Sequence, residues 1–582
     1  MQRLSRTVWE TAMNSKIKSI FKRIYDSRIL RLLFIIAGAL LFIIFFLFPA
    51  IVKSWSYLST ELEISYCVDD PLYWAVGRGI LNGLKPYVDL FENKPPGIFW
   101  LSALSLKLTG GVYAMNIFSF LCLLITALTP AIGATVLCWK RACGKGVTIL
   151  AILSSLFFGA MLMVFSKTLS GYIQIEAMGA MFVGLYLILI FDADASKLKF
   201  YSPRVLLSGL LLACAGLLKE PFVLVAAGSS LLFIGTLRGF FHKTVLPLLY
   251  GGAIGTAAMA ATGVLKPYLT IYLKYMISSR VESTSSPLIR MWDLSHLFNE
   301  TANVSVPFLC VLTLLFITIL FYYLQDVYAL PSAGLKSRLC WGGRFLALFA
   351  GLMAASFALA VGGRYFYHHF VFALPFYLTL FLVMLRGSAV KPVVLQPKKE
   401  DGNSPIGFGP KACRTILAVV LVILSVSFRF MPSYQFDETI RQDFETMETH
   451  AEYVDSLLDE MGIDRYLFLG FNNSGSCFYG LTEHSPLGPV FVQDPANFTG
   501  QYTWFNDNFL EELDEAQIVF VWSINVGDLT DDVWAILNTE FVRDDAHSVN
   551  MDNNPVPGLP DGFTYITYIR NATWEALVTN AQ

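Results

Sequence analysis

The sequence predicts a polytopic α-helical membrane protein of about 11 transmembrane helices, with a small α/β domain outside the membrane at its C-terminal end. The first observation is composition: 55% of the 582 residues are hydrophobic and 15% are charged, against about 25% charged residues in a soluble domain. The second is uneven charge, because residues 437–582 contain 26 acidic residues, four arginines and no lysine, yet the whole chain has a net charge of −2. A basic membrane part and an acidic tail indicate two compartments, and they exclude a soluble enzyme and a basic nucleic-acid-binding protein.

The first 31 residues form a basic N-terminal tail. They contain eight lysines and arginines and two acids, and an uncharged run over residues 32–52 follows. This run is long enough to cross about 30 Å of hydrocarbon. It also exceeds the roughly 7–15 residues of a signal-peptide core, and no small-residue cleavage site follows it. We therefore expect an uncleaved first helix and a cytoplasmic N-terminus, because basic flanks stay inside.

Ten further apolar runs complete the predicted membrane domain, residues 32–430. They fall near residues 112–138, 147–165, 176–191, 204–218, 222–237, 244–264, 305–324, 345–361, 370–385 and 415–430. If successive runs alternate in direction, every junction rich in lysine and arginine lies on the cytoplasmic side. The odd number of spans then places the acidic tail outside a multi-pass protein of the cell membrane.

The fourth and fifth of these ten runs, residues 204–218 and 222–237, are short, and Lys219-Glu220-Pro221 separates them. One long helix would leave one of its basic flanks outside. A hairpin keeps both flanks inside and places the Lys-Glu tip at the outer face, so the sequence favours a hairpin.

The acidic tail, residues 431–582, has the pattern of a small α/β unit. Residues 465–471, 517–522 and 563–569 are predicted strands, and residues 438–461 and 531–541 are predicted helices. By this topology Cys67 and Cys477 lie outside the membrane, and they form either a disulfide between the first outer loop and the tail or two free thiols.

The first outer loop, residues 53–111, contains the residues that most clearly suggest chemistry. Asp69 and Asp70 precede an amphipathic helix predicted over about residues 71–82, whose first proline suits a helix N-terminus. Carboxylates are also stabilised there by the helix dipole. Alone, this is an ordinary helix start, but the loop continues with two further blocks, Gly83-Leu-Lys85-Pro86-Tyr87-Val-Asp89 and Phe91-Glu92-Asn93-Lys94-Pro95-Pro96.

Together with Asp69-Asp70-Pro-Leu-Tyr73, these blocks resemble the first outer loop of the GT-C class of polyprenyl-phosphate-sugar-dependent glycosyltransferases. Within that class, the sequence is similar to glycosyltransferase family 39. Protein O-mannosyltransferases and the aminoarabinose transferase of lipid A belong to this class. Its loop reads Asp-(Asp/Glu)-x-x-Tyr, then Gly-x-x-Pro-Tyr-x-Asp, then an aromatic residue and Lys-Pro-Pro. The likeness covers about residues 30–430 and implies the GT-C fold. Weaker similarities follow in Gly171-Tyr-Ile-Gln-Ile-Glu176, Lys219-Glu220-Pro221 and Gly362-Gly-Arg364-Tyr365-Phe-Tyr367-His368-His369.

The resemblance implies an enzyme that moves a sugar from a polyprenyl phosphate to an acceptor hydroxyl at the outer membrane face, with inversion. Such a transfer needs a carboxylate that accepts the proton and cations that stabilise the departing phosphate. We assign Asp69 as the general base and Asp70 as a residue that orients it or the acceptor. The candidates for the donor phosphate are Lys94, Arg364 and Lys219, and those for substrate binding are Tyr73, Glu92, Glu176, Glu220, Tyr367 and His368.

Simpler interpretations of some of these residues remain open. Lys219 and Glu220 could pair with each other at a loop tip, Glu176 could be an interfacial helix start, and Arg364 could be an interfacial anchor. The adjacent His368 and His369 do not share a helix face and have no evident third ligand, so a metal is not indicated. Leu72 stands where the aminoarabinose transferase has an arginine, which argues against that substrate.

The expected partners are the lipid-linked donor, with no other cofactor, and an acceptor that is a protein, a glycolipid or a wall polymer; nucleic acid is not expected. The rival class is a transporter or flippase, which would place charges near the membrane midplane on broken helices. Here the middles of the spans are nearly free of charge, and ionisable residues gather at one face. A third class is a catalytically inactive relative kept for its acidic tail, against which the intact Asp69, Lys94 and Arg364 speak. No motif identifies the sugar.

Overall fold

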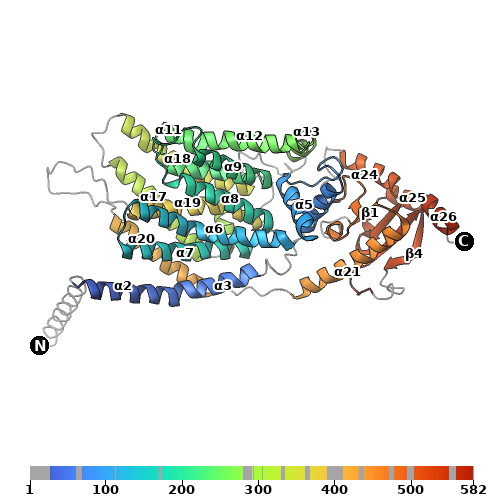
Figure 1. Ribbon diagram of the computed structural model, residues 1–582, viewed down its shortest axis with the longest axis horizontal. Coiled ribbons are helices and arrows are strands. Elements are labelled where there is room, and N and C mark those ends of the chain that lie inside the picture. The colour runs from blue at the N-terminus through green and yellow to red at the C-terminus, as the bar shows by residue number, and fades with distance from the viewer. Residues whose placement is uncertain are drawn as a thin grey trace.

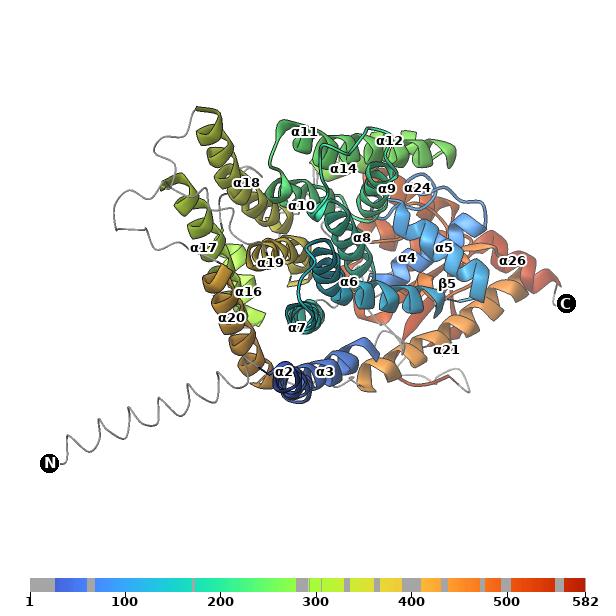
Figure 2. The same ribbon diagram turned by 60° about the vertical axis from the view of Figure 1, so that its left-hand side comes forward.

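The computed structural model describes residues 27–59, 69–111, 113–169, 173–278, 292, 294–304, 306–328, 335–360, 367–389, 410–430, 438–470, 477–493, 504–549 and 559–580. A bundle of apolar helices occupies one end of the molecule and an α/β domain the other (Figure 1). Part of the first outer loop forms two helices, α4 (Asp70–Leu81) and α5 (Gly97–Thr109). Figures 1 and 2 show both helices beside the α/β domain, at one end of the bundle.

Within the described residues, each of the eleven apolar runs lies mostly on helix. The bundle consists of α2 (Arg28–Phe42), η1 (Ile43–Leu47), α3 (Phe48–Ser59), α6 (Tyr113–Lys140), α7 (Lys145–Leu169), α8 (Ile173–Phe191), α9 (Pro203–Leu218), α10 (Pro221–Ser230), η2 (Leu231–Phe233), α11 (Leu237–Phe240), η3 (Phe241–Val245), α12 (Leu246–Ala261), α17 (Val306–Tyr328), α18 (Leu335–Ala360), η5 (Tyr367–Ala373), α19 (Leu374–Ala389) and α20 (Pro410–Phe430). Two further short helices, α14 (Leu273–Ser278) and α16 (Ser295–Val304), lie between α12 and α17.

Within the described residues, six stretches are long and apolar enough to cross a membrane. They are Ile36–Trp55, Ala114–Lys140, Lys145–Leu162, Leu237–Ala261, Gly342–Ala360 and His369–Gly387. Several of the other predicted spans are shorter apolar helices, among them Ile175–Phe191, Pro203–Leu218 and Pro221–Phe233. The prediction of a helical membrane protein with a small sheet domain is therefore confirmed at that level. The count of eleven spans and the side on which each end lies stay predictions.

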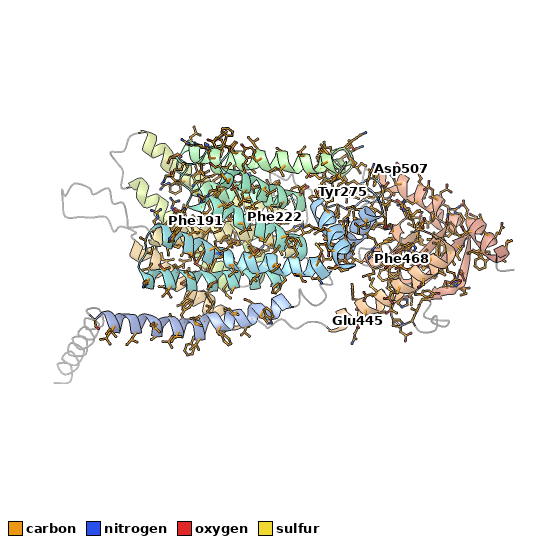
Figure 3. The ribbon with its side chains drawn as sticks, in the orientation of Figure 1. Phe191, Phe222, Tyr275, Glu445, Phe468 and Asp507 are labelled. Atoms are coloured by element: carbon orange, nitrogen blue, oxygen red, sulfur yellow. The ribbon has the colours of Figure 1, made fainter. Side chains whose placement is uncertain are left out.

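Close packing of small and aromatic residues holds the bundle together. A Cβ atom at Gly159 of α7 would overlap the carbonyl oxygen of Ala127 in α6, so these two helices approach closely because position 159 has no side chain. Between α7 and α19, the rings of Phe158 and Phe381 stack with their centroids 4.0 Å apart. Phe191 and Phe222 lie inside the same bundle (Figure 3).

The chain reverses direction at Lys219, as the hairpin prediction requires. Lys219 has extended backbone (φ −161°, ψ 119°) and ends α9, and Pro221 opens α10. Phe233, at the end of η2, packs against Phe191 at the end of α8, with centroids 5.3 Å apart. Since α9 starts shortly after Phe191, α9 and α10 run in opposite directions, and Lys219 and Glu220 lie at their shared tip.

The α/β domain is a five-stranded mixed sheet with helices. Its strands are β1 (Arg465–Leu469), β2 (Ser485–Pro486), β3 (Ile518–Trp522), β4 (Phe541–Val549) and β5 (Tyr565–Arg570), in the order β2-β1-β3-β5-β4. β1 pairs in parallel with β2 and β3, whereas β5 pairs antiparallel with β3 and β4. The helices are α21 (Glu438–Met461), α24 (Trp504–Glu515), α25 (Asp531–Glu540) and α26 (Asn571–Asn580).

The α/β domain and the first outer loop share one apolar core. Phe91 of the loop packs on Phe505 of α24, with ring centroids 5.2 Å apart. A Cβ atom at Gly480 would overlap the carbonyl oxygen of Pro71, so η6 (Cys477–Gly480) lies directly against the start of α4. The main-chain N–H of Phe91 also donates to the carbonyl of Pro489 at 3.1 Å. These contacts fix the loop between the bundle and the domain.

Candidate functional site

Asp69 stands immediately before α4, but its carboxylate does not cap that helix. The Asp69 carbonyl accepts from the N–H groups of Leu72 and Tyr73, as in a helix start, whereas the side chain makes no capping hydrogen bond. Its Oδ2 instead accepts from the Tyr73 hydroxyl at 3.3 Å and lies 3.4 Å from Lys94 Nζ. The interpretation of Asp69 as a simple cap is therefore wrong for its side chain.

Lys94 is surrounded by acceptors from its own loop. Its Nζ donates to Glu92 Oε1 at 3.1 Å and to Asn93 Oδ1 at 3.0 Å, besides its pair with Asp69. The same ammonium group lies 5.6 Å from the centroid of the Tyr73 ring. The Lys94 side chain is 13% exposed and that of Glu92 is 3% exposed. An ammonium this deeply placed requires its anionic neighbours.

A second buried ion pair joins the hairpin tip to α8. Lys219 Nζ lies 2.6 Å from Oε1 of Glu176, which is in the first turn of α8. The Lys219 ammonium also lies 5.0 Å from the centroid of the Phe372 ring in η5. Lys219 is thus paired across the bundle and not with its neighbour Glu220. Glu176 is buried at the start of its helix, and this pairing gives its carboxylate a partner that the sequence did not indicate.

The two ion pairs belong to one cluster, and Tyr73 lies among its carboxylates. Burial, followed by the charges of Asp69, Glu176, Glu92 and Asp70, raises the pKa of the Tyr73 hydroxyl well above its ordinary value. The Tyr73 hydroxyl therefore stays protonated and remains a donor to Asp69. Asp70 is buried as well.

The α/β domain borders this cluster through Cys477. Burial, followed by the charges of Asp69, Asp70 and Glu92, raises the pKa of the Cys477 thiol well above its ordinary value. Cys477, at the start of η6, therefore lies within electrostatic range of these carboxylates. Cys67 lies outside the described residues, so the alternatives of a disulfide with Cys477 and of two free thiols both stand as the sequence left them.

Glu220 has partners that sequence reasoning missed. Its Oε1 accepts from the hydroxyls of Tyr268 at 3.0 Å and Tyr272 at 2.8 Å. Both tyrosines come from η4 (Tyr268–Tyr272), a single π-helical turn, and their rings stack with centroids 4.8 Å apart. The only signal in the sequence is a pair of tyrosines four residues apart in an outer loop, which is too common to assign.

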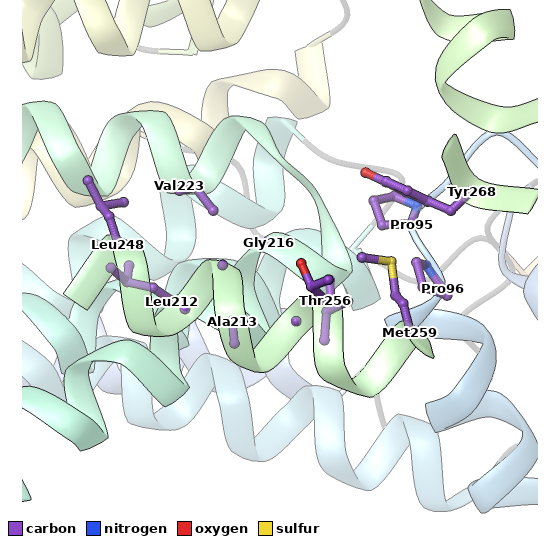
Figure 4. A pocket seen from close by; sticks show the side chains of 14 residues that line it. Pro95, Pro96, Leu212, Ala213, Gly216, Val223, Leu248, Thr256, Met259 and Tyr268 are labelled. Atoms are coloured by element: carbon purple, nitrogen blue, oxygen red, sulfur yellow. The ribbon is translucent and has the colours of Figure 1, made fainter. Parts of the chain in front are cut away.

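An apolar cavity of about 230 Å³ lies next to Lys94. Pro95 and Pro96 directly follow that lysine and line one end of the cavity with Tyr268, whereas Leu212 and Leu248 lie at the other end (Figure 4). Four glycines contribute to its wall and leave room between α9 and α12, namely Gly216, Gly251, Gly252 and Gly255. The cavity runs from Pro95 and Pro96 of the first outer loop along α9 and α12 of the helix bundle.

The remaining predicted site residues are only partly described. Arg364 lies outside the described residues. Tyr367 and His368 are in η5, and their side chains are not described. Phe372 of the same helix packs on Phe222, with centroids 4.9 Å apart, which brings η5 alongside the hairpin tip. Leu72 is buried in the apolar core and supplies no phosphate contact.

Chemically, the described part of the cluster offers carboxylates and lysines side by side in a nearly dry environment. Such a site can accept a proton and can stabilise an anionic leaving group. No group of three or more His, Cys, Asp or Glu residues that could hold a metal ion occurs among the residues described.

Comparisons of the chain with protein-family models, with curated proteins and with solved structures give no match. The assignment of a function therefore depends on the residues of this cluster and their geometry.

Proposed function

We propose that the chain is a membrane glycosyltransferase of the GT-C type that transfers a sugar from a polyprenyl phosphate to an acceptor hydroxyl at the outer membrane face, with inversion. The observation that carries the proposal is the buried cluster of Asp69, Lys94, Glu176 and Lys219 at one end of an apolar bundle. Three segments far apart in the sequence contribute to it. An apolar cavity begins beside Lys94, so a charged head and a hydrocarbon tail would find adjacent sites.

In the proposed reaction Asp69 is the general base. The acceptor oxygen attacks the anomeric carbon of the sugar, the bond from that carbon to the phosphate oxygen breaks, and Asp69 takes the hydroxyl proton. The polyprenyl phosphate leaves with the electron pair of the broken bond. Asp70 orients the base or the acceptor, and the Tyr73 hydroxyl holds Asp69 Oδ2.

The phosphate would compete with carboxylates for both lysines. Lys94 pairs with Asp69 and Glu92, and Lys219 pairs with Glu176. When Lys94 turns to a phosphate oxygen, Asp69 loses a neutralising neighbour and becomes a stronger base. Binding of the donor would therefore activate the base. Lysine acts here as a point charge, and Arg364 is proposed to add a bidentate contact to the same phosphate.

The cavity supports a lipid-linked donor. Its lining is almost entirely apolar, which suits hydrocarbon, and Pro95 at one end of it directly follows Lys94 in the chain. Glu92, Glu176, Tyr73, Tyr367 and His368 remain the candidates that contact the sugar or the acceptor.

The alternative of a transporter or flippase is less well supported by the position of the charges. A translocation path requires ionisable groups partway along the bundle. The pairs Lys94–Asp69 and Lys219–Glu176 instead lie together at one end of it, at the hairpin tip and the first outer loop. Chemistry at a membrane surface fits this placement better.

The test compares the purified wild type with Asp69→Asn, using radiolabelled polyprenyl-phosphate sugars as donors and a crude membrane extract as the source of acceptor. We expect the substitution to lower transfer by about 10²–10⁴-fold, the usual contribution of a general base. Asp192→Asn is the matched control, because Asp192 lies 3.4 Å from Lys140 Nζ at the other end of the bundle. It should transfer like the wild type.

The outcomes separate the class from the mechanism. Equal transfer by wild type and Asp69→Asn would reject Asp69 as the base and leave the class standing. If the wild type consumes none of the donors, the proposal fails, and uptake by liposomes becomes the assay for a transporter.

A further inference from the structure

Tyr87 has an unusual backbone conformation in the first outer loop. Its φ is +68°, and among the described residues only Ala142 is another non-glycine residue with positive φ. A bulky aromatic residue rarely adopts this left-handed region, and such a conformation persists only where the surroundings enforce it. Here the turn is closed by the N–H of Tyr87, which donates to the Leu90 carbonyl at 2.7 Å.

The Tyr87 side chain reaches the main chain of Lys94. Its hydroxyl donates to the Lys94 carbonyl oxygen at 2.7 Å, and the residue is fully buried. Pro95 follows Lys94 and already restricts its backbone to an extended conformation. The tyrosine hydroxyl thus fixes the one carbonyl that lies between the Lys94 side chain and the proline wall of the cavity.

Two tyrosines of η4 pack against the Tyr87 ring and connect it to Glu220 at the hairpin tip. The centroid of that ring lies 5.3 Å from that of Tyr272 and 6.1 Å from that of Tyr268. The hydroxyls of these two tyrosines both donate to Glu220. A continuous series of contacts therefore runs from Glu220 through the tyrosine pair to Tyr87 and on to the Lys94 carbonyl.

We propose that Tyr87 is a positioning residue that sets the place of the Lys94 ammonium group relative to Lys219, so that both lysines can meet one donor phosphate. Lys219 directly precedes Glu220 in the chain, so the hairpin tip positions Lys219 through the backbone. The same tip positions Lys94 through the η4 tyrosines and Tyr87. Glu220 then acts as the support of the tyrosine pair and not as a substrate contact. This inference rests on the proposed function, since it assigns the spacing of the phosphate-binding lysines.

The test is Tyr87→Phe, which keeps the ring and removes only the hydroxyl. Tyr186→Phe is a close control: Tyr186 is equally buried, and its hydroxyl donates to the carbonyl of another lysine, Lys243, at 2.6 Å within the bundle. For both variants we would measure kcat and KM for donor and acceptor, thermal unfolding, and binding of a polyprenyl phosphate and of the matching polyprenol.

We expect Tyr87→Phe to raise the donor KM and the Kd for polyprenyl phosphate about tenfold, the scale of one lost hydrogen bond. The acceptor KM and the Kd for polyprenol should not change. On a Lys94→Met background Tyr87→Phe should have no further effect on phosphate binding, because both changes act through the same ammonium group. Tyr186→Phe should lower the unfolding temperature without changing any binding constant.

If the wild type transfers sugar, either of two results would overturn the inference. One is that Tyr87→Phe has the same KM and Kd values as Tyr186→Phe. The other is that the effect of Tyr87→Phe on phosphate binding adds fully to that of Lys94→Met. A wild type that neither transfers nor prefers polyprenyl phosphate over polyprenol would instead reject the proposed function, and this inference with it. The experiment therefore distinguishes the two failures.

Discussion

At the scale of single residues, the main property of the site is that its cations are already neutralised. Lys219 and Glu176 form a pair whose side chains are 12% and 3% exposed. Removing one partner of such a pair leaves the other charge buried without compensation. This lowers the free energy of unfolding by about 3–5 kcal/mol. The Lys219 ammonium group of this pair is also the group that we propose binds the donor phosphate. Stability and proposed function thus make different demands on one contact.

Substitutions of this pair should separate the two demands. Lys219→Met and Glu176→Gln should each lower the unfolding temperature, since each leaves one buried charge alone. The double variant should regain most of the lost stability, because neither charge remains, yet it should stay defective in transfer because the phosphate has lost a cation. Thermal unfolding and the transfer assay measure the two effects. A double variant with normal transfer would show that Lys219 has only a structural role.

At the scale of elements, the segment that holds the first outer loop depends on a buried carboxyl group. Oε1 of Glu512 in α24 accepts from the N–H of Val490 at 2.7 Å, next to the Pro489 carbonyl that receives Phe91 N–H. Burial raises the pKa of Glu512 from 4.5 to about 8, and its hydrogen bond from Val490 and the charge of Arg465 oppose that rise. The folded protein therefore keeps Glu512 protonated at neutral pH.

Because the folded pKa exceeds the unfolded one, the stabilising effect of this group is complete below about pH 4.5 and is lost as the pH rises through about 8. Over that window it lowers the free energy of unfolding by up to about 1.4 kcal/mol per pH unit. Glu512→Gln should remove this slope from a series of unfolding temperatures between pH 5.5 and 9. The exposed neighbour Glu515→Gln should keep it, and an unchanged slope in Glu512→Gln would reject the assignment.

Elements with a clear hydrophobic period could be predicted closely from the sequence. α21 has the predicted bounds, α4 differs by one residue at each end, and β1, β3 and β5 begin and end within two residues of the prediction. β4 was missed, and Phe541, predicted as the helix end, opens it. Its run Arg543-Asp544-Asp545 is poor in strand formers, but β4 is the last strand of the sheet, where charged residues are favoured.

The site was predictable in its residue types but not in its pairing. The loop motif assigned Asp69 and Lys94 to one outer loop, and the structure adds that their side chains pair. The partners Glu176 for Lys219, and Tyr268 and Tyr272 for Glu220, depend on how α8, the hairpin and η4 meet in space. No local pattern encodes such contacts. The same holds for Gly480 against Pro71, which links the domain to the loop.

At the scale of the whole molecule, the charge asymmetry predicts an orientation. The bundle surface carries many exposed apolar side chains, such as Ile44, Phe48 and Trp55 of the first helix, which a bilayer would cover. The positive-inside rule then predicts that the acidic domain lies on the outer side of that membrane.

This orientation can be checked with reporter fusions. Alkaline phosphatase, which needs an oxidising compartment, should be active when fused after residue 582. It should be inactive when fused within residues 392–410, which lie between the last two predicted spans and are therefore predicted to be cytoplasmic. A reporter that works only in the cytoplasm should give the reverse pattern. Activity of the phosphatase at both positions would show that the last predicted span, residues 415–430, does not cross the membrane.

The shared core of the loop and the domain also has a consequence for how the chain is made. Leu72, Phe91 and Phe99 leave the ribosome 339 to 366 residues before α21 begins at Glu438. At about 5–20 residues per second, their apolar partners in the domain arrive tens of seconds later. With the predicted topology, the loop has already crossed the membrane during this interval, and its aromatic side chains are not yet covered by the domain. Assembly of this protein should therefore depend on a holding chaperone there, and it should be most sensitive to slow translation between the two halves of that core.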